Sequence, residues 1–368
     1  MDRIRFEGHA LPCLIGSLPL TDYGEAADWV ERFTPEIPLW VQLPRLPGEV
    51  ITRQFAAGMP GLTVTGERFF IDREGEGFPA ALERFYEEVL AIEEGLGDLE
   101  GSRFALSPDA AGGFFELERR AAAWERPPLA VKGQIIGPVT FGTSLADGRG
   151  RPLFYDPELR EAALRLLALR ARWQVRRLSA LAPRVLLFLD DPAITAFGSS
   201  QHIGLGREEI VEGINAVIAA VHREGGLAGV HICANADWTL VFDSEADIVS
   251  FDAYSFFDRF VIYAEPIRRF LDRGGGIAWG LIPPLPPGDL ERESAASLHA
   301  RFQEQAGRLC ALGVEPARLV AQSLITPACG MGTLSRELAW RGLELTRALS
   351  ERIRGAPGSG GPPREVAA

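Results

Sequence analysis

The sequence has 368 residues, of which 46% are hydrophobic and 24% charged, and its formal net charge is −12. This length and composition suffice for one large core, and the acidic balance without a basic patch argues against nucleic acid as a partner. No apolar run is long enough to span a membrane and the N-terminus lacks a signal-peptide pattern, so we expect a cytoplasmic protein with no membrane partner. Four cysteines in so long a chain do not indicate a disulfide framework.

Apolar runs and helix-spaced apolar stripes alternate along the chain. Continuous apolar runs predict buried strands, which we place at residues 11–19, 37–43, 129–136, 185–189, 226–233, 247–251, 276–282 and 319–325. Stripes with apolar residues three and four positions apart predict helices, which we place at residues 26–33, 79–94, 157–181, 207–224, 264–273, 292–312 and 334–353. Residues 62–72 are apolar at first and then charged, and we expect an extended excursion there.

Strands that are apolar throughout and alternate with helices are typical of a parallel sheet that is covered on both faces. The count of strands is close to eight, so we predict an α/β fold of the (β/α)8 TIM-barrel type. The barrel would be a single domain over residues 1–354, and a doubly wound sheet is the alternative. Residues 355–368 are rich in Pro and Gly and lack an apolar stripe, which predicts a disordered tail.

Reactive side chains follow several of the predicted strands, at the end of the barrel where such folds place their chemistry. His231 and Cys233 are two positions apart on one strand, so they share a face and offer two ligands that suit zinc. Cys329 follows another apolar run and could supply a second thiolate. Each residue taken alone could serve only packing, and an Asp after a strand is most often a helix cap. The other strand-end candidates are Ser17, Gly137 to Thr140, Asp190, Asp191 and Asp252.

Together these residues resemble the catalytic barrel of cobalamin-independent methionine synthase, within the uroporphyrinogen decarboxylase-like superfamily. The resemblance follows the order of the family and spans nearly the whole chain. It is carried by Ile15-Gly16-Ser17-Leu18-Pro19, Gly137-Pro138-Val139-Thr140, Asp190-Asp191-Pro192, His231-Ile232-Cys233, Asp252 and Pro327-Ala328-Cys329-Gly330. We expect no counterpart of the additional N-terminal barrel of the family.

The resemblance implies a zinc site and a binding site for a small-molecule thiol. The ligands would be His231, Cys233 and Cys329, with Asp252 where the family has Glu. The preferred substrate would be homocysteine, which is methylated to methionine. Asp190 would bind its ammonium group, and the backbone and hydroxyl groups from Ile15 to Ser17 would bind its carboxylate. For Ser17, a helix cap before Thr21 is an equally good interpretation.

The expected ligands favour one kind of zinc chemistry. A free thiol has a pKa of about 8.5, and zinc deprotonates a coordinated thiol. Two cysteinates and a carboxylate more than neutralise the charge of the ion, so a substrate thiolate would stay electron-rich. Zinc sites that hydrolyse substrates have fewer anionic ligands, so their zinc ion is a stronger Lewis acid. The ligand set therefore predicts alkylation of a thiol rather than hydrolysis.

The chain departs from the family on the side that binds folate. Phe141-Gly-Thr-Ser144 follows the Gly-Pro-Val-Thr motif, where the family has a Trp that stacks on folate. Ala193-Ile-Thr-Ala196 lacks the folate-binding Glu, Ala328 replaces an acidic residue, and the segment 280–284 lacks the proton-donating His. The methyl donor is therefore expected to be a methylcorrinoid protein rather than polyglutamyl methyltetrahydrofolate.

Three alternatives stay open from the sequence. A methylcobamide:coenzyme M-type methyltransferase would use a similar zinc ligand set on this fold. A uroporphyrinogen decarboxylase-like enzyme would share the fold without needing the three zinc ligands. A non-catalytic zinc-binding or redox-sensing accessory protein would close all coordination positions with its own side chains.

Overall fold

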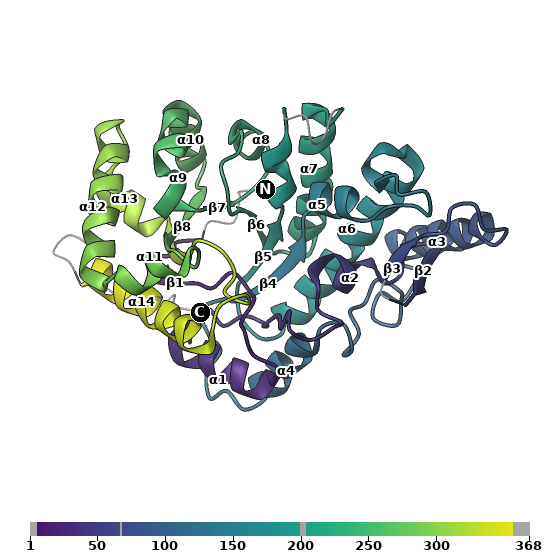
Figure 1. Ribbon diagram of the computed structural model, residues 1–368, viewed down its shortest axis with the longest axis horizontal. Helices are drawn as coiled ribbons and strands as arrows, with labels where there is room; N and C mark the ends of the chain where they lie inside the picture. The colour runs from purple at the N-terminus through teal and green to yellow at the C-terminus, as the bar shows by residue number, and fades with distance from the viewer. Residues whose placement is uncertain (1–5, 67, 199–203, 356–368) are drawn as a thin grey trace.

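The computed structural model describes residues 6–66, 68–198 and 204–355, and the tail predicted for residues 355–368 lies outside the described residues except for Gly355. Its centre is a curled parallel sheet with strand order β1-β9-β8-β7-β6-β5-β4, surrounded by helices (Figure 1). The strands of this sheet are β1 (Leu11–Pro12), β4 (Val131–Ile136), β5 (Val185–Asp190), β6 (Leu227–Ile232), β7 (Ile248–Phe251), β8 (Gly276–Ile282) and β9 (Ser323–Pro327).

Helices follow most of the strands and form an outer layer around the sheet in Figure 1. They are α1 (Tyr23–Phe33), α2 (Ile51–Ala56), α3 (Phe78–Glu93), α4 (Gly112–Ala121), α5 (Pro138–Ser144), α6 (Pro157–Ser179), α7 (Arg207–Arg223), α8 (Thr239–Phe242), α9 (Ala253–Phe260), α10 (Ala264–Asp272), α11 (Pro287–Arg292), α12 (Ala295–Ala311), α13 (Pro316–Ala321) and α14 (Arg336–Arg354). Among the described residues, no helix combines the length and apolar character that crossing a lipid bilayer requires. The cytoplasmic location stays a prediction.

The parallel α/β arrangement is confirmed, whereas the predicted closed barrel of eight strands is not shown. The segment 37–43 was expected to be a full strand, but it makes only isolated bridges to its neighbours. On one side Lys132 N donates to Pro38 O (2.9 Å), and on the other Gln42 N donates to Gly16 O (3.1 Å). Proline cannot donate to a strand ladder, which weakens the pairing of this segment. The sheet is thus a seven-stranded half-barrel, and the segment 37–43 lies between its two edges.

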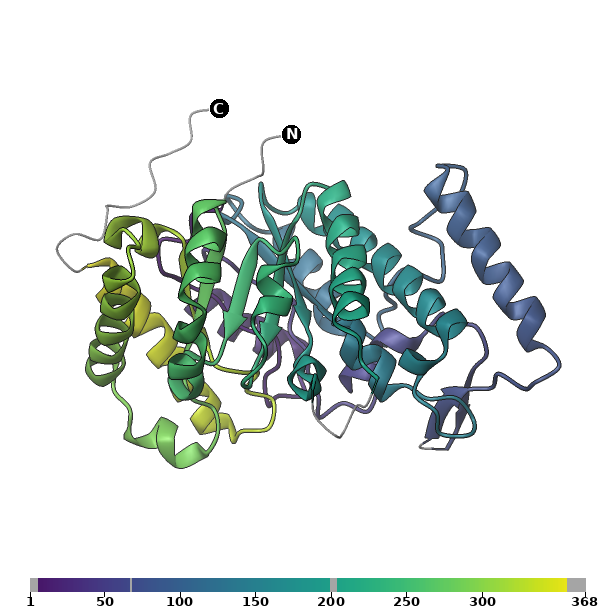
Figure 2. The ribbon, with the colours of Figure 1, turned by 90° about the horizontal axis from the view of Figure 1, so that it is seen from above.

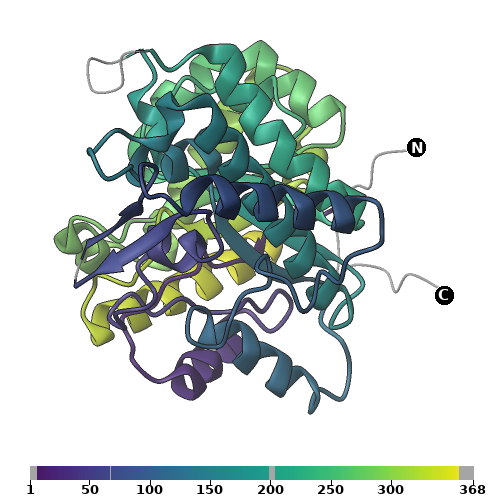
Figure 3. The ribbon, with the colours of Figure 1, turned by 90° about the vertical axis from the view of Figure 1, so that its right-hand side faces the viewer.

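The predicted excursion is an antiparallel hairpin that does not pair with the main sheet, formed by β2 (Leu62–Thr65) and β3 (Arg68–Ile71). Figures 2 and 3 show this hairpin together with α3 at one end of the molecule. Ile71 N donates to Ala146 O (3.0 Å), which attaches the hairpin to the loop after α5. The excursion therefore extends the side of the barrel without contributing to its sheet.

Inside the curled sheet, a second and smaller apolar cluster is separate from the core under the helices. Six strands of the sheet contribute side chains, and Ala130 lies directly before the seventh, β4. The members are Leu11, Cys13, Ile37, Ala130, Leu186, Phe188, Leu227, Ile248, Ala278 and Leu324. Side chains two positions further along a strand face the same way. Two positions after a member of the cluster, the inward-facing residue is polar on four strands, namely Lys132, Asp190, Ser250 and Thr326. On β6 the position two after Leu227 is Gly229, and His231 follows two positions later. The apolar cluster is thus the floor beneath a layer of polar side chains.

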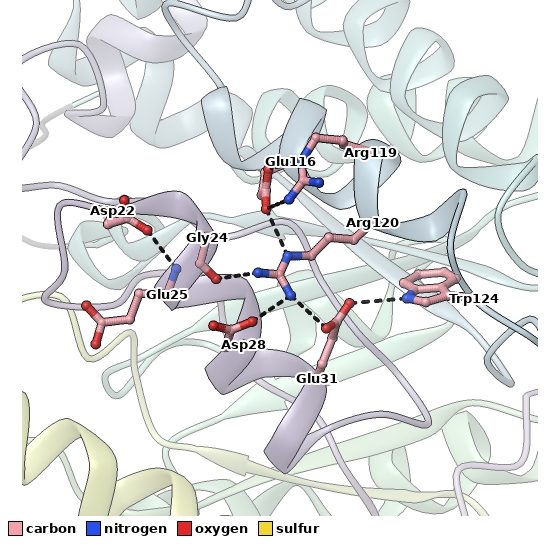
Figure 4. A network of polar contacts seen from close by, with 9 residues as sticks. All are labelled: Asp22, Gly24, Glu25, Asp28, Glu31, Glu116, Arg119, Arg120 and Trp124. Carbon is pink, nitrogen blue, oxygen red and sulfur yellow. Dashed lines mark hydrogen bonds and ion pairs between the residues drawn. The ribbon is translucent and has the colours of Figure 1, made fainter.

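On the outside of the barrel, Arg120 joins α4 to α1 (Figure 4). Its guanidinium contacts Asp28 (2.7 Å), Glu31 (2.9 Å) and Glu116 (2.8 Å), and it donates to Gly24 O (2.7 Å). Hydrogen bonds from Arg119 and then Arg120 lower the pKa of Glu116 to about 2. Because this network is half-buried, it holds α1 and α4 against each other, and we expect it to stabilise the fold more than an isolated ion pair on the surface would.

The Glu116 carboxylate is expected to stabilise the fold only while it is ionised. Its pKa in the folded state is about 2, and the ordinary value is 4.5, so the stabilisation is complete above pH 4.5 and is lost as the pH falls towards 2. We expect Glu116→Gln to lower the free energy of unfolding by about 1 to 2 kcal/mol at pH 7, after allowance for solvent screening. Urea unfolding of both proteins at pH 7 and pH 3 measures this. A deficit of the variant that is as large at pH 3 as at pH 7 would contradict the assignment.

Candidate metal and substrate site

Three predicted ligands converge at the end of the half-barrel. One ligand atom each from His231, Cys233 and Cys329 lies within 4.8 Å of the other two. His231 and Cys233 come from the end of β6, and Cys329 comes from the turn after β9. Ala328 N donates to Ile282 O (2.9 Å), so the turn that carries Cys329 stays attached to β8. Residues almost 100 positions apart are thus brought together by the carboxyl ends of parallel strands.

The His231 ring has one nitrogen that is bonded and one that is not. Its Nδ1 lies 2.9 Å from Ser250 Oγ. Its Nε2 is buried and has no hydrogen-bond partner in the described part of the chain. A buried polar atom without a partner is costly, so it indicates a ligand that binds there.

The thiols of Cys233 and Cys329 shift each other's pKa in opposite directions. The hydrogen bond from Cys329, and to a smaller extent the neighbouring His231, lowers the pKa of the Cys233 thiol. The same hydrogen bond raises the pKa of the Cys329 thiol. Two sulfur atoms and a bare imidazole nitrogen form a donor set that suits zinc, and zinc would replace the shared proton.

Asp252, the fourth predicted ligand, is not a member of this group of three. Its carboxylate caps α9, since Oδ1 accepts a hydrogen bond from Ser255 N (2.8 Å). Burial raises the pKa of the Asp252 carboxyl, and the charge of Cys233 raises it further. Its role as a ligand stays a prediction.

Asp190, the predicted ammonium ligand, is buried beside His231. The two residues are register partners on β5 and β6. Burial raises the pKa of the Asp190 carboxyl to about 6, against the opposing effects of His231 and Lys132. Its Oδ1 has no hydrogen-bond partner in the described residues. An unpartnered carboxylate oxygen that is kept from water is suited to a cationic group of a ligand.

The neighbouring Asp191 holds the turn at the start of α5. Its carboxylate accepts hydrogen bonds from Val139 N (3.1 Å), Thr140 N (2.7 Å) and Thr140 Oγ1 (2.6 Å). A Cβ atom on Gly137 would lie 2.2 Å from the Cβ of Asp191, so only glycine fits there. These contacts join the Gly-Pro-Val-Thr and Asp-Asp-Pro segments in the folded chain.

Ser17 contacts the turn that carries Cys329. Its carbonyl accepts from Met331 N (3.0 Å), and its Oγ accepts from Gly332 N (3.2 Å). A Cβ atom on Gly330 would lie 2.2 Å from Ser17 Oγ. The cap of α1 is Asp22, which accepts from Glu25 N (2.7 Å), so Ser17 is not that cap. Its role in binding the substrate stays a prediction.

Lys132 is a residue of this region that the sequence analysis did not single out. It is fully buried, and its Nζ donates to Ile15 O (2.5 Å) and lies 4.6 Å from the centre of the Phe188 ring. It therefore supports the predicted substrate turn from inside the barrel. A signal was available, because Lys132 is the only lysine in the sequence and lies within an apolar run. A lysine is seldom fully buried without a specific task.

No protein-family model matches the chain, and no curated protein matches it. Among solved structures, a B12-independent methionine synthase from Shewanella sp. W3-18-1, in complex with selenomethionine, aligns with a TM-score of 0.47 and 17% identity over 66% of each chain. An ochratoxinase of A. niger aligns with a TM-score of 0.26 and 10% identity, over 66% of this chain and 63% of that one.

Fungal β-1,4-galactanases align with a TM-score of 0.26 and 16% identity, over 62% of this chain and 65% of theirs. The chain spans just under two thirds of the length of the solved structures that it matches. None of these similarities identifies a family for the chain.

Proposed function

We propose that the protein is a zinc-dependent methyltransferase that transfers a methyl group to a small-molecule thiol, with homocysteine as the acceptor and methionine as the product. The observation that carries the proposal is the group of His231, Cys233 and Cys329, whose ligand atoms lie within 4.8 Å of one another around a buried and unpartnered Nε2. Together with Asp252 these residues would hold the metal. Bound zinc lowers the pKa of a coordinated thiol, so the nucleophilic thiolate is available at neutral pH.

The remaining residues would bind the amino-acid part of the acceptor. Asp190 Oδ1 would accept hydrogen bonds from the ammonium group, because it is buried and lacks a partner in the described chain. The turn from Ile15 to Ser17 would bind the carboxylate. An acceptor with an ammonium group is favoured over a thiol of the coenzyme M type, because the Asp190 carboxylate would repel the sulfonate group of that thiol.

The methyl donor that we propose is a methylcorrinoid protein. The resemblance would require a folate-stacking Trp shortly after Thr140, but the segment 141–144 contains no Trp, and its one aromatic residue, Phe141, is fully buried in the core under the helices. In the reaction, the sulfur–carbon bond forms as the cobalt–carbon bond breaks. The cobalt keeps the electron pair and leaves as cob(I)alamin, and the thiol proton passes to solvent.

Turnover with two donors tests the assignment. We expect the zinc-loaded protein to convert homocysteine to methionine with methylcobalamin or a methylcorrinoid protein, and not with methyltetrahydrofolate. Parallel reactions with coenzyme M and with 3-mercaptopropionate define the acceptor, and homocysteine should react fastest. Turnover with folate alone would exclude the corrinoid donor. A zinc-loaded protein that methylates no thiol with either donor would exclude the whole proposal.

Lys132→Met is expected to weaken the binding of homocysteine while leaving the zinc affinity unchanged. The variant removes the hydrogen bond to Ile15 O, but it keeps most of the volume. A hydrogen bond contributes about 0.5 to 1.5 kcal/mol, so KM for homocysteine should rise about 2- to 10-fold. Steady-state kinetics and zinc titration check the two parts. An unchanged KM would show that Lys132 serves only the core.

A further inference from the structure

We propose that Ser250 is a positioning residue of the metal site, which holds the His231 ring in the tautomer that presents a bare Nε2 to the metal. The inference rests on the proposed function, because it concerns the affinity of the same site for zinc. Ser250 would not bind the metal itself but would orient the ligand His231.

The sheet brings the two residues together by register. His231 on β6 and Ser250 on β7 are partners in the parallel ladder. Leu227 and Ile248 on the same strands belong to the inner apolar cluster, so side chains an even number of positions later also face the interior. His231 is 3% exposed and Ser250 is fully buried. Water is therefore kept from the contact of 2.9 Å between Nδ1 and Oγ.

The chemistry of imidazole links this contact to the other ring nitrogen. A neutral histidine carries one N–H group and one bare nitrogen. When Nδ1–H donates to Ser250 Oγ, the bare nitrogen is Nε2, which belongs to the group with the two cysteine sulfurs and lacks a partner in the described residues. An outer partner that accepts from one ring nitrogen fixes both the tautomer and the ring orientation of a metal-binding histidine, and Ser250 Oγ is such a partner when Nδ1 carries the proton.

Within the described residues, the Ser250 hydroxyl has no other hydrogen-bond partner that competes with His231. Its contact with His231 Nδ1 is its only hydrogen bond within the described ranges. Ser244 differs, although it is equally buried, since its Oγ donates to Val241 O (2.7 Å) and accepts from Ala246 N (3.2 Å) at a turn. Ser244 is therefore a matched control for the loss of a buried serine hydroxyl away from the site.

Competition between the protein and a chelator for Zn²⁺ tests the proposal. Ser250→Ala is expected to bind Zn²⁺ about 10- to 100-fold more weakly than the unaltered protein. Ser250→Thr retains the hydroxyl and should retain most of the affinity, and Ser244→Ala should bind Zn²⁺ as the unaltered protein does. If Ser250→Ala binds Zn²⁺ as tightly as the unaltered protein, the proposal is wrong and the metal site stands without it.

Nitrogen-15 NMR of the unaltered, zinc-loaded protein gives an answer that does not depend on the folding of a variant. The expected spectrum shows a proton on Nδ1 of His231 and the metal on Nε2. The reverse arrangement overturns the role of Ser250. Failure of the unaltered protein to bind Zn²⁺ at all overturns the proposed function instead, and this inference with it.

Discussion

Replacing Cys329 by serine is expected to weaken zinc binding by more than 100-fold. The Cys329 sulfur is one of the three ligand atoms that lie within 4.8 Å of one another, and a serine hydroxyl is a poor substitute because it stays protonated at neutral pH. Changes outside the ligands of a metal already lower its affinity about 10- to 100-fold, so loss of a ligand should exceed that range. Metal analysis of the purified variant and competition with a chelator measure the effect.

Cys310 provides the matched control for this experiment. It is a half-buried cysteine on α12 that packs against the core under the helices, away from the ligand group. Cys310→Ser should retain the full zinc content. Equal zinc affinities in Cys329→Ser and Cys310→Ser would show that the metal is not held by the site described above.

Replacing Arg170 by methionine is expected to lower the free energy of unfolding by about 3 to 5 kcal/mol. Arg170 is 1% exposed on α6, and its guanidinium donates to four backbone carbonyls. The acceptors are Phe55 O (2.6 Å), Ala57 O (2.7 Å), Arg103 O (3.0 Å) and Phe104 O (3.2 Å). Methionine fills most of the space but donates nothing, so buried carbonyls at the end of α2 and in the 103–104 turn lose their partner.

Arg165 on the same helix is the control for this variant. Its side chain is 45% exposed and pairs with Glu93 and Glu161 at the surface. Exposed pairs contribute little, so Arg165→Met should lower the free energy of unfolding by less than about 1 kcal/mol. Urea unfolding compares the two variants. Similar values for both would mean that the buried carbonyls find other partners when Arg170 is removed.

The parallel sheet and the convergence of His231, Cys233 and Cys329 could be predicted from local patterns. Apolar runs alternate with helical stripes, and this pattern requires parallel strands whose carboxyl ends meet at one edge. Two residues separated by one position on a strand share a face, which settles the relation of His231 to Cys233. The third ligand followed because the Cys329 run also ends at that edge.

Other features depend on tertiary contacts that no local pattern reveals. The segment 37–43 has the composition of a strand, but it pairs only through isolated bridges beside Pro38. Asp191 follows a strand and was a candidate site residue, but its carboxylate accepts hydrogen bonds from Val139 N and Thr140 N. Lys132 lies within an apolar run, and only the folded chain shows that its Nζ donates to Ile15 O.

Zinc K-edge X-ray absorption before and after the addition of homocysteine measures the central claim most directly. For the purified and reduced protein we expect about one zinc per chain, bound by the sulfur atoms of Cys233 and Cys329. Homocysteine should add a third sulfur to the coordination shell, which would show that the substrate thiol binds the metal. A protein without zinc, or a shell whose sulfur content does not change with homocysteine, would contradict a site for thiol activation.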